Sequence, residues 1–176
     1  MLFTTGITTS IGDHDHVNGN ESWPVVGGML PDEDIKAMIK EMALENLMLH
    51  YDCTTKAKIA ASYAKKKYEN VLVRVGMCLV YSGDWESSYG FYYNPPYEFH
   101  SWAEVPGIGI IDIGLPGIIH NGLNSKDDVG YFLCGREPSI LCGAPPNWVR
   151  YLAYETYEPS LWRESECMIW KKSREL

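Results

Sequence analysis

Three residues stand in an order that suits nucleophilic acyl transfer: Cys53, His100 and Asp112. A thiol attacks a carbonyl carbon only as the thiolate, so it needs a neighbouring imidazole to take its proton. The imidazole in turn needs a carboxylate that fixes its tautomer and orientation. These residue types therefore predict a cysteine enzyme that forms a thioester at Cys53, with His100 as general base and acid and Asp112 as the residue that orients His100.

The segment that must position Cys53 has the pattern of a helix. Small and aromatic residues recur at steps of three and four after Cys53, and lysines occupy the other positions. The predicted inward stripe is Ala57, Ala60, Ala61, Ala64 and Tyr68, and the predicted opposite face is Lys56, Lys58, Lys65, Lys66 and Lys67. Cys53 then lies in the first turn and is directed inward, where the helix dipole favours a thiolate and backbone N–H groups are available to bind an oxyanion.

The other two residues fall on a predicted β-hairpin. Residues 97–105 and 109–113 are β-like runs separated by the turn signal Pro106-Gly107. In such a hairpin, residues 100 and 112 lie nearly opposite each other, close enough for a hydrogen bond. A further apolar run at residues 71–81 predicts a central strand in which Cys78 is a buried structural thiol.

The rest of the chain predicts a single domain around this core. Residues 1–30 indicate an irregular, strand-poor lead-in, residues 31–115 the catalytic core, and residues 116–176 a loop-rich elaboration. Pro31 followed by three acidic residues predicts a helix that runs to about Leu49. Prolines and glycines interrupt residues 114–147, so this segment is expected to be helix-poor, and residues 148–176 have no clean period. The expected class is α+β, with helices packed on an antiparallel sheet.

Residues 82–96 predict a loop that is dense in aromatic side chains. Because this loop precedes the strand that carries His100, we expect Trp85 and Tyr89 to take part in selecting the substrate. The alternative is that these rings pack under the loop onto the core.

Composition and charge narrow the choice of partners. The chain of 176 residues is 45% hydrophobic with a formal net charge of −8, which predicts a globular core and disfavours a nucleic-acid partner. No run reaches the roughly 20 apolar residues that a membrane span needs, so no membrane partner is expected. The five cysteines are scattered along the chain, which favours free thiols in a reducing, cytoplasmic compartment.

The other histidines have simpler interpretations. The run Asp13-His14-Asp15-His16 contains metal-ligand residue types, but nothing nearby fixes a coordination geometry. A solvated loop is the better interpretation, so no metal and no cofactor are expected. His50 fits a helix end and His120 a solvent-facing loop.

Four stretches around the three residues carry a family resemblance. They are Asp52-Cys53-Thr54-Thr55-Lys56-Ala57, Val71-Leu72-Val73-Arg74-Val75-Gly76, His100-Ser101-Trp102-Ala103-Glu104-Val105 and Ile110-Ile111-Asp112-Ile113. Within about residues 50–115, the sequence resembles the transglutaminase-like branch of the papain-fold cysteine enzymes. The resemblance implies a papain-like fold in which Cys53 is the nucleophile, His100 the general base and acid, and Asp112 the residue that orients His100. Trp102, on the same strand face as His100, is then expected to pack beside the site and to contribute to substrate binding.

The sequence departs from the family pattern after the aspartate. Many members have Pro-Thr at that point, whereas Ile113-Gly114 follows Asp112 here. This ending is similar to that of arylamine N-acetyltransferases, but their arginine- and glycine-rich lead into the cysteine is absent, so acetyl-CoA chemistry ranks lower. The side chain that completes the oxyanion hole in this superfamily is left open, with Trp23 and Asn46 as candidates.

We therefore expect acyl transfer on a peptide, a protein or another amide or ester substrate. Transfer to water gives a peptidase or amidase, and transfer to an amine gives a transglutaminase-type transferase. The alternative that the sequence leaves open is a catalytically inactive transglutaminase-like module with a binding or structural role.

Overall fold

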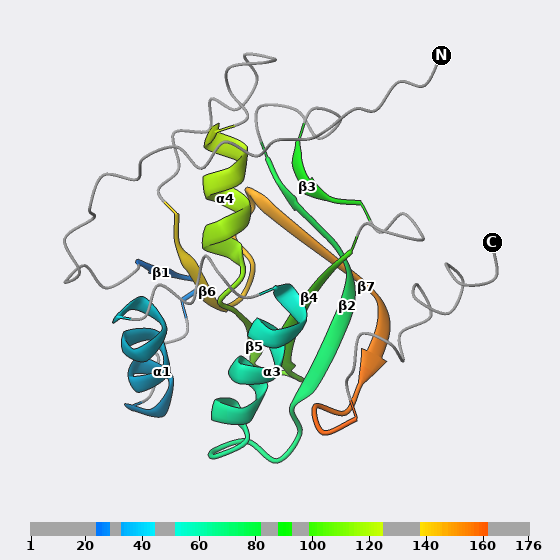
Figure 1. Ribbon diagram of the computed structural model, residues 1–176. Coiled ribbons are helices and arrows are strands. Elements are labelled where there is room, and N and C mark those ends of the chain that lie inside the picture. The colour runs from blue at the N-terminus through cyan, green and yellow to red at the C-terminus, as the bar shows by residue number, and fades with distance from the viewer. Residues whose placement is uncertain are drawn as a thin grey trace, which may run out of the picture.

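The computed structural model describes residues 24–28, 33–44, 52–81, 88–92, 99–124 and 138–161 (Figure 1). In chain order the elements are β1 (Val25–Val26), α1 (Glu33–Leu44), α3 (Cys53–Ala64), β2 (Leu72–Val80), β3 (Tyr89–Phe91), β4 (His100–Val105), β5 (Gly109–Asp112), α4 (Leu115–Asn124), β6 (Ile140–Gly143) and β7 (Val149–Tyr157). The class is α+β, as predicted. The predicted helix at Cys53, the strand at residues 71–81 and the hairpin around Pro106-Gly107 are all confirmed.

The strands form one mixed sheet. Its hydrogen-bonded order is β1-β6-β5-β4-β2, with β7 along the far edge of β2. The described pairs are antiparallel except β1 with β6, where Val25 faces Ile140 in parallel register. The expectation of an antiparallel sheet is therefore wrong at this edge, because part of the predicted strand-poor lead-in joins the sheet, and apolar patterning does not specify strand direction.

One edge of β2 is shared by two strands. β4 pairs with Leu72–Gly76 and β3 pairs with Cys78–Val80, and both run antiparallel to β2. Phe91 faces Cys78 and His100 faces Gly76, so the two pairings end on either side of Met77. The edge is thus interrupted directly beside His100. β3 itself lies in the segment where the sequence predicted only a loop.

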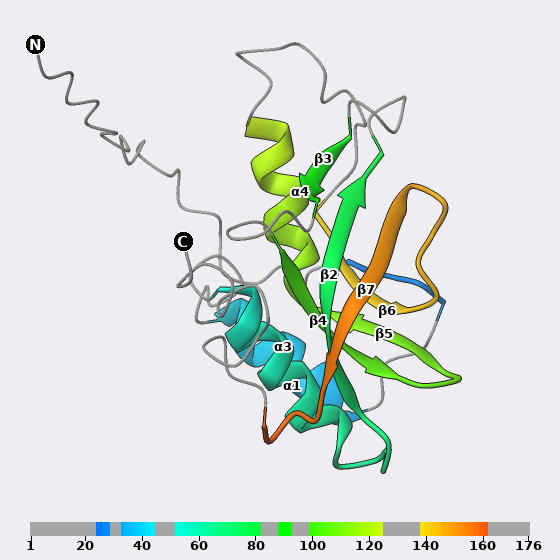
Figure 2. The same cartoon turned by 90° about the vertical axis from the view of Figure 1, so that its right-hand side faces the viewer.

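Two apolar clusters fill the structure. In β4 and β5, Ala103 and Ile111 belong to the cluster that packs under α1 and α3, whereas Trp102 and Ile110 belong to a second cluster that includes residues of α4. Because neighbouring strand residues point to opposite faces, each face of the sheet carries one cluster. Figure 2 shows α1 and α3 side by side against the sheet, and Figure 1 shows α3 crossing in front of β4 and β5.

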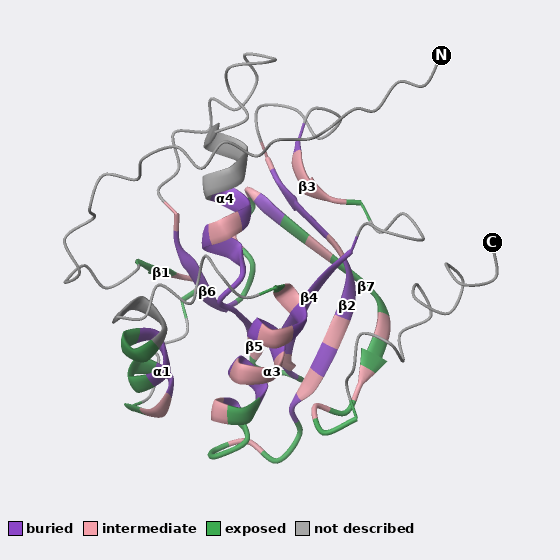
Figure 3. Ribbon diagram, viewed as in Figure 1, coloured by how far each residue is buried: buried purple, intermediate pink, exposed green. Residues whose placement is uncertain are grey.

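Two elements differ from the sequence prediction. Helix α4 forms within the segment expected to be helix-poor, since its proline, Pro116, falls in the first turn, where a missing N–H is tolerated. Strand β7 was missed because most of its residues are exposed or half-buried, as Figure 3 shows, and no apolar alternation marks it. α4 has 10 residues, and no helix in the described part of the chain is both long and apolar enough to cross a membrane.

Candidate active site

Cys53 is the first residue of α3. Asp52 caps this helix: its side chain accepts a hydrogen bond of 2.7 Å from the Thr55 N–H, and its carbonyl accepts one of 3.1 Å from the Lys56 N–H. Among the described residues, the N–H groups of Cys53 and Thr54 have no hydrogen-bond acceptor. The half-buried thiol of Cys53 therefore lies at the positive end of the helix dipole, beside two free donors.

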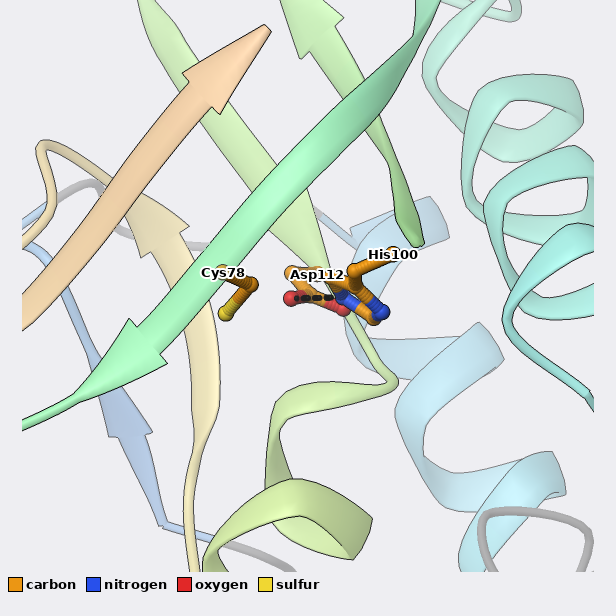
Figure 4. Close-up of side chains that lie close together, drawn as sticks. All are labelled: Cys78, His100 and Asp112. Carbon is orange, nitrogen blue, oxygen red and sulfur yellow. Dashed lines mark hydrogen bonds and ion pairs between the residues drawn. The ribbon is translucent and has the colours of Figure 1, made fainter. Parts of the chain in front are cut away.

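His100 and Asp112 form a buried pair, drawn with its dashed hydrogen bond in Figure 4. Nε2 of His100 lies 2.7 Å from Oδ2 of Asp112, and the two side chains are 1% and 2% exposed. The predicted contact is confirmed, but the register differs from the expected one. Ala103 faces Ile111, which places Asp112 opposite Trp102 and diagonal to His100. A diagonal pair on one sheet face is still within reach of a ring side chain.

Gly114 completes the support of Asp112 and leaves room for His100. Its N–H donates a hydrogen bond of 2.7 Å to Oδ1 of Asp112. A Cβ at this position would lie 2.9 Å from Cε1 of His100 and 3.0 Å from Oδ1 of Asp112, which is too close for either contact. The absence of a side chain at Gly114 therefore leaves the room that the histidine ring occupies.

Tyr151, on β7, is a site residue that the sequence interpretation missed. Its hydroxyl donates a hydrogen bond of 2.6 Å to Oδ2 of Asp112, the same oxygen that His100 contacts. Burial and the charge of Asp112 raise the pKa of Tyr151 well above its ordinary value, so the hydroxyl keeps its proton and remains a donor. No local sequence pattern marks it, because its position depends on the pairing of β7 with β2, which places Tyr151 beside Cys78.

Aromatic rings hold the imidazole in place. Phe91 stacks on His100 with ring centroids 5.9 Å apart, and Trp102 stacks on it at 6.0 Å. Tyr151 meets Trp102 edge to face at 4.9 Å. The predicted packing of Trp102 beside the site is confirmed. Trp102 is 1% exposed, and its ring helps to hold the His100 ring in position.

The electrostatics favour a charged pair at this site. Burial opposes the charge of His100, but the charge and hydrogen bond of Asp112, followed by the interactions with Cys53, raise its pKa to about 10. Burial would also raise the pKa of the Cys53 thiol, but interactions with His100 and then Ser101 outweigh it and lower that pKa. The pKa of Asp112 is lowered in spite of burial, because His100 and Tyr151 stabilise the carboxylate. Together these directions favour thiolate Cys53 beside imidazolium His100.

The second ring nitrogen of His100 is the one left for Cys53. Nε2 is occupied by Asp112, and the buried Nδ1 has no hydrogen-bond partner of good geometry among the described residues. Two neighbouring buried atoms, Oγ of Ser101 and Nε1 of Trp102, are also unpaired within the described part of the chain, so it is the interaction between His100 and Cys53 that marks Nδ1 as the atom available to the thiol.

Cys78 lies close to the His100–Asp112 pair. The ligand atoms of Cys78, His100 and Asp112 all lie within 4.8 Å of one another, so these buried residue types could hold a metal ion in principle (Figure 4). Burial, followed by the charge of Asp112, raises the pKa of the Cys78 thiol well above its ordinary value. A metal would need this thiol deprotonated and Nε2 of His100 released from Asp112, so the hydrogen-bonded pair suits an acid–base role better.

The remaining candidates are less informative. Tyr89 lies in β3, faces Val80 and packs against the second cluster. Its role in substrate selection stays a prediction. The predicted residues Trp85, His14, His16, His50, Trp23 and Asn46 lie outside the described residues. The prediction that His120 lies in a loop is wrong, because residue 120 is part of helix α4; its side chain lies outside the described part of the structure.

Comparisons of the chain with protein-family models, with curated proteins and with solved structures find no match.

Proposed function

We propose that this protein is a cysteine-dependent acyl-transfer enzyme of the transglutaminase-like superfamily, with a papain-like fold. The observation that carries the proposal is the buried hydrogen bond from His100 to Asp112, which orients a ring whose other nitrogen is left for Cys53. A peptide, a protein or another amide or ester is the proposed acyl donor. Cys53 and Cys78 are free thiols, which suits the reducing conditions of the cytoplasm.

Acylation starts from the thiolate and the imidazolium. The thiolate of Cys53 attacks the carbonyl carbon, and a sulfur–carbon bond forms. The bond from that carbon to the leaving nitrogen or oxygen then breaks, and Nδ1 of His100 gives its proton to the leaving amine or alcohol. The products of this step are a thioester at Cys53 and neutral His100, still held by Asp112.

Deacylation returns the site to its starting state. Neutral His100 takes a proton from water or from an amine, whose oxygen or nitrogen attacks the thioester carbonyl. The sulfur–carbon bond breaks and Cys53 leaves as the thiolate. Water gives a carboxylic acid, the reaction of a peptidase or amidase, and an amine gives a new amide, the reaction of a transferase.

The test is to trap the thioester with p-nitrophenyl acetate, a small activated ester. We expect release of p-nitrophenolate and an acetyl group on Cys53 that hydroxylamine removes, both followed by mass spectrometry of the digested protein. Cys53→Ala should abolish the acetylation, and His100→Ala should slow it by about 10²-fold or more. Exposed Lys67→Met serves as the matched control and should react like the wild type.

The non-catalytic transglutaminase-like module predicts a different result. In that case no cysteine is acetylated, or Cys53 is acetylated no faster than the other cysteines and His100→Ala has no effect. Either result would replace the enzyme interpretation by a binding or structural role.

A further inference from the structure

Lys56 is buried where the sequence pattern predicted a solvent-facing lysine. It is 7% exposed, whereas Lys65 and Lys66, just after the C-terminal end of α3, are exposed and pair with acidic side chains. Among the described residues, no carboxylate forms an ion pair with Lys56. Lysine side chains are rarely this buried, so Lys56 is not part of a solvated helix face.

Helix geometry directs this side chain toward Cys53. Lys56 lies three residues after Cys53 in α3. Long helical side chains lean toward the N-terminus, over residues three and four positions earlier. The ammonium thus extends toward the thiol and the free N–H groups at the start of the helix. Burial lowers the pKa of Lys56, while the negative charges of Asp112, Cys53 and Asp52 oppose that lowering, which agrees with this placement.

Lys56 adds a second positive charge to this site. It is buried, it lies at the positive end of a helix dipole, and it lies in the same site as the His100 imidazolium. The helix dipole and the two positive charges stabilise a further negative charge that forms at the start of α3. Acyl transfer creates such a charge on the carbonyl oxygen of the group attached to Cys53.

We propose that Lys56 is a further catalytic residue, whose ammonium binds the oxyanion of the tetrahedral intermediate together with the N–H groups of Cys53 and Thr54. The proposal rests on the acyl transfer proposed above. As the sulfur–carbon bond forms, the π electrons of the carbonyl move onto its oxygen. They return to the C–O bond when the leaving group departs with the proton from His100. Lys56 keeps its own proton throughout.

Two reactions of the same thiolate test this role. Alkylation by iodoacetamide forms no oxyanion, whereas acetylation by p-nitrophenyl acetate does. Both rates are measured for Cys53 at the pH plateau, where the thiolate is fully formed, in the wild type and in Lys56→Met, Lys56→Arg and Lys58→Met. The last is a matched control on the same helix.

We expect Lys56→Met to slow acetylation by about 10²-fold or more, since that is the usual effect of losing one oxyanion donor. Its alkylation plateau should change by less than about threefold, because alkylation needs no oxyanion stabilisation. Lys56→Arg should recover most of the acetylation rate, and Lys58→Met should behave as the wild type. Lys56→Met should also unfold at a higher temperature, because it removes a buried charge.

The contrary results are distinct. An equal loss of both reactions, or an unchanged rate of acetylation, would overturn the role of Lys56 and leave the thioester chemistry at Cys53 intact. A wild-type protein that is alkylated but never acetylated at Cys53 would contradict the proposed function, and the role of Lys56 with it.

Discussion

Two cysteines lie close to one histidine, and their surroundings give them opposite character. Cys53 is half-buried at the start of a helix, whereas Cys78 is fully buried in the middle of a strand. Burial favours the neutral form of both thiols. At Cys53, interactions with His100 and Ser101 outweigh burial and lower the pKa of the thiol. At Cys78, the charge of Asp112 acts in the same direction as burial and raises the pKa of the thiol further. Position relative to the two ends of the His100–Asp112 pair therefore gives the two thiols opposite pKa shifts.

Replacing each cysteine in turn gives the largest predicted contrast. Cys53→Ala should reduce acetylation by p-nitrophenyl acetate to the rate of the uncatalysed reaction, a loss on the order of 10³-fold or more, because the nucleophile is gone. Cys78→Ala should keep most of the acetylation and lose about 1 kcal/mol of unfolding free energy through a small cavity. Stopped-flow kinetics and urea denaturation measure the two effects. A reversed assignment, with acetylation lost in Cys78→Ala, would break the comparison.

Asp112→Asn should have the next largest effect. An amide cannot stabilise the imidazolium, so acetylation should fall by on the order of 10² to 10⁴-fold, and the pKa of Cys53 should rise toward its usual value of about 8.5. The matched control is Glu104→Gln, on the same strand as His100, where the carboxylate pairs with Arg74 away from the site. Activity lost equally in both variants would show that the effect is structural.

The same pair predicts how stability depends on pH. Although His100 is buried, Asp112 raises its pKa from 6.5 to about 10. The contribution of charged His100 to the stability of the folded protein is therefore complete below pH 6.5 and is lost as the pH rises through about 10. The pKa of Asp112 is lowered, so its stabilisation is present above the unfolded value of about 3.9 and is lost as the pH falls below it. The melting temperature should therefore be highest between about pH 4 and 6.5. In Asp112→Asn the decline from pH 6.5 to 10 should flatten, and an unchanged decline would contradict the pairing.

Gly114→Ala should have a smaller effect on the same half of the site. The new Cβ displaces the His100 ring and the Asp112 carboxylate, at a cost of about 1 to 3 kcal/mol in unfolding free energy and with slower acetylation. Gly107→Ala is the control, since Gly107 has a φ of +77° in the hairpin turn and no atom near its added Cβ. It should lose about 1 kcal/mol of stability and none of the acetylation. Equal acetylation in the two variants would show that the room beside the ring is unimportant.

Tyr151→Phe should give the smallest change. It removes one of the hydrogen bonds that hold Asp112, so acetylation should fall about tenfold and the pH profile of Cys53 alkylation should shift upward slightly. Tyr63→Phe removes a comparable hydrogen bond, to Glu41 on the surface, and should leave both measurements unchanged. A Tyr151→Phe profile identical to the wild type would show that Tyr151 has only a structural role.

The parts of the fold near the site could be predicted because their signals are local. An alanine stripe after Cys53 marked α3, and Pro106-Gly107 marked the turn that brings Asp112 toward His100. The predicted register of the hairpin was wrong by two residues. Gly109 faces Val105 directly after the turn, so Asp112 lies opposite Trp102 and not opposite His100.

The parts that were missed depend on contacts between distant segments. Tyr151 reaches Asp112 across 39 residues of sequence, from an edge strand whose exposed side chains show no alternation. Lys56 looked like part of a solvated helix face, because a charge pattern cannot show that one lysine of five is covered by the rest of the fold. Gly114 was noted only as a departure from the family pattern, and its reason is the nearby histidine ring.

The most direct test is the pH dependence of iodoacetamide alkylation at each cysteine, measured by mass spectrometry in the wild type and in His100→Ala. We predict that Cys53 alone reacts rapidly well below pH 8.5, and that this reactivity is lost in His100→Ala, while Cys78 stays unreactive in both proteins. If Cys53 reacts no faster than Cys78, or if its profile is the same without His100, the thiolate–imidazolium pair does not exist and the enzyme interpretation is contradicted.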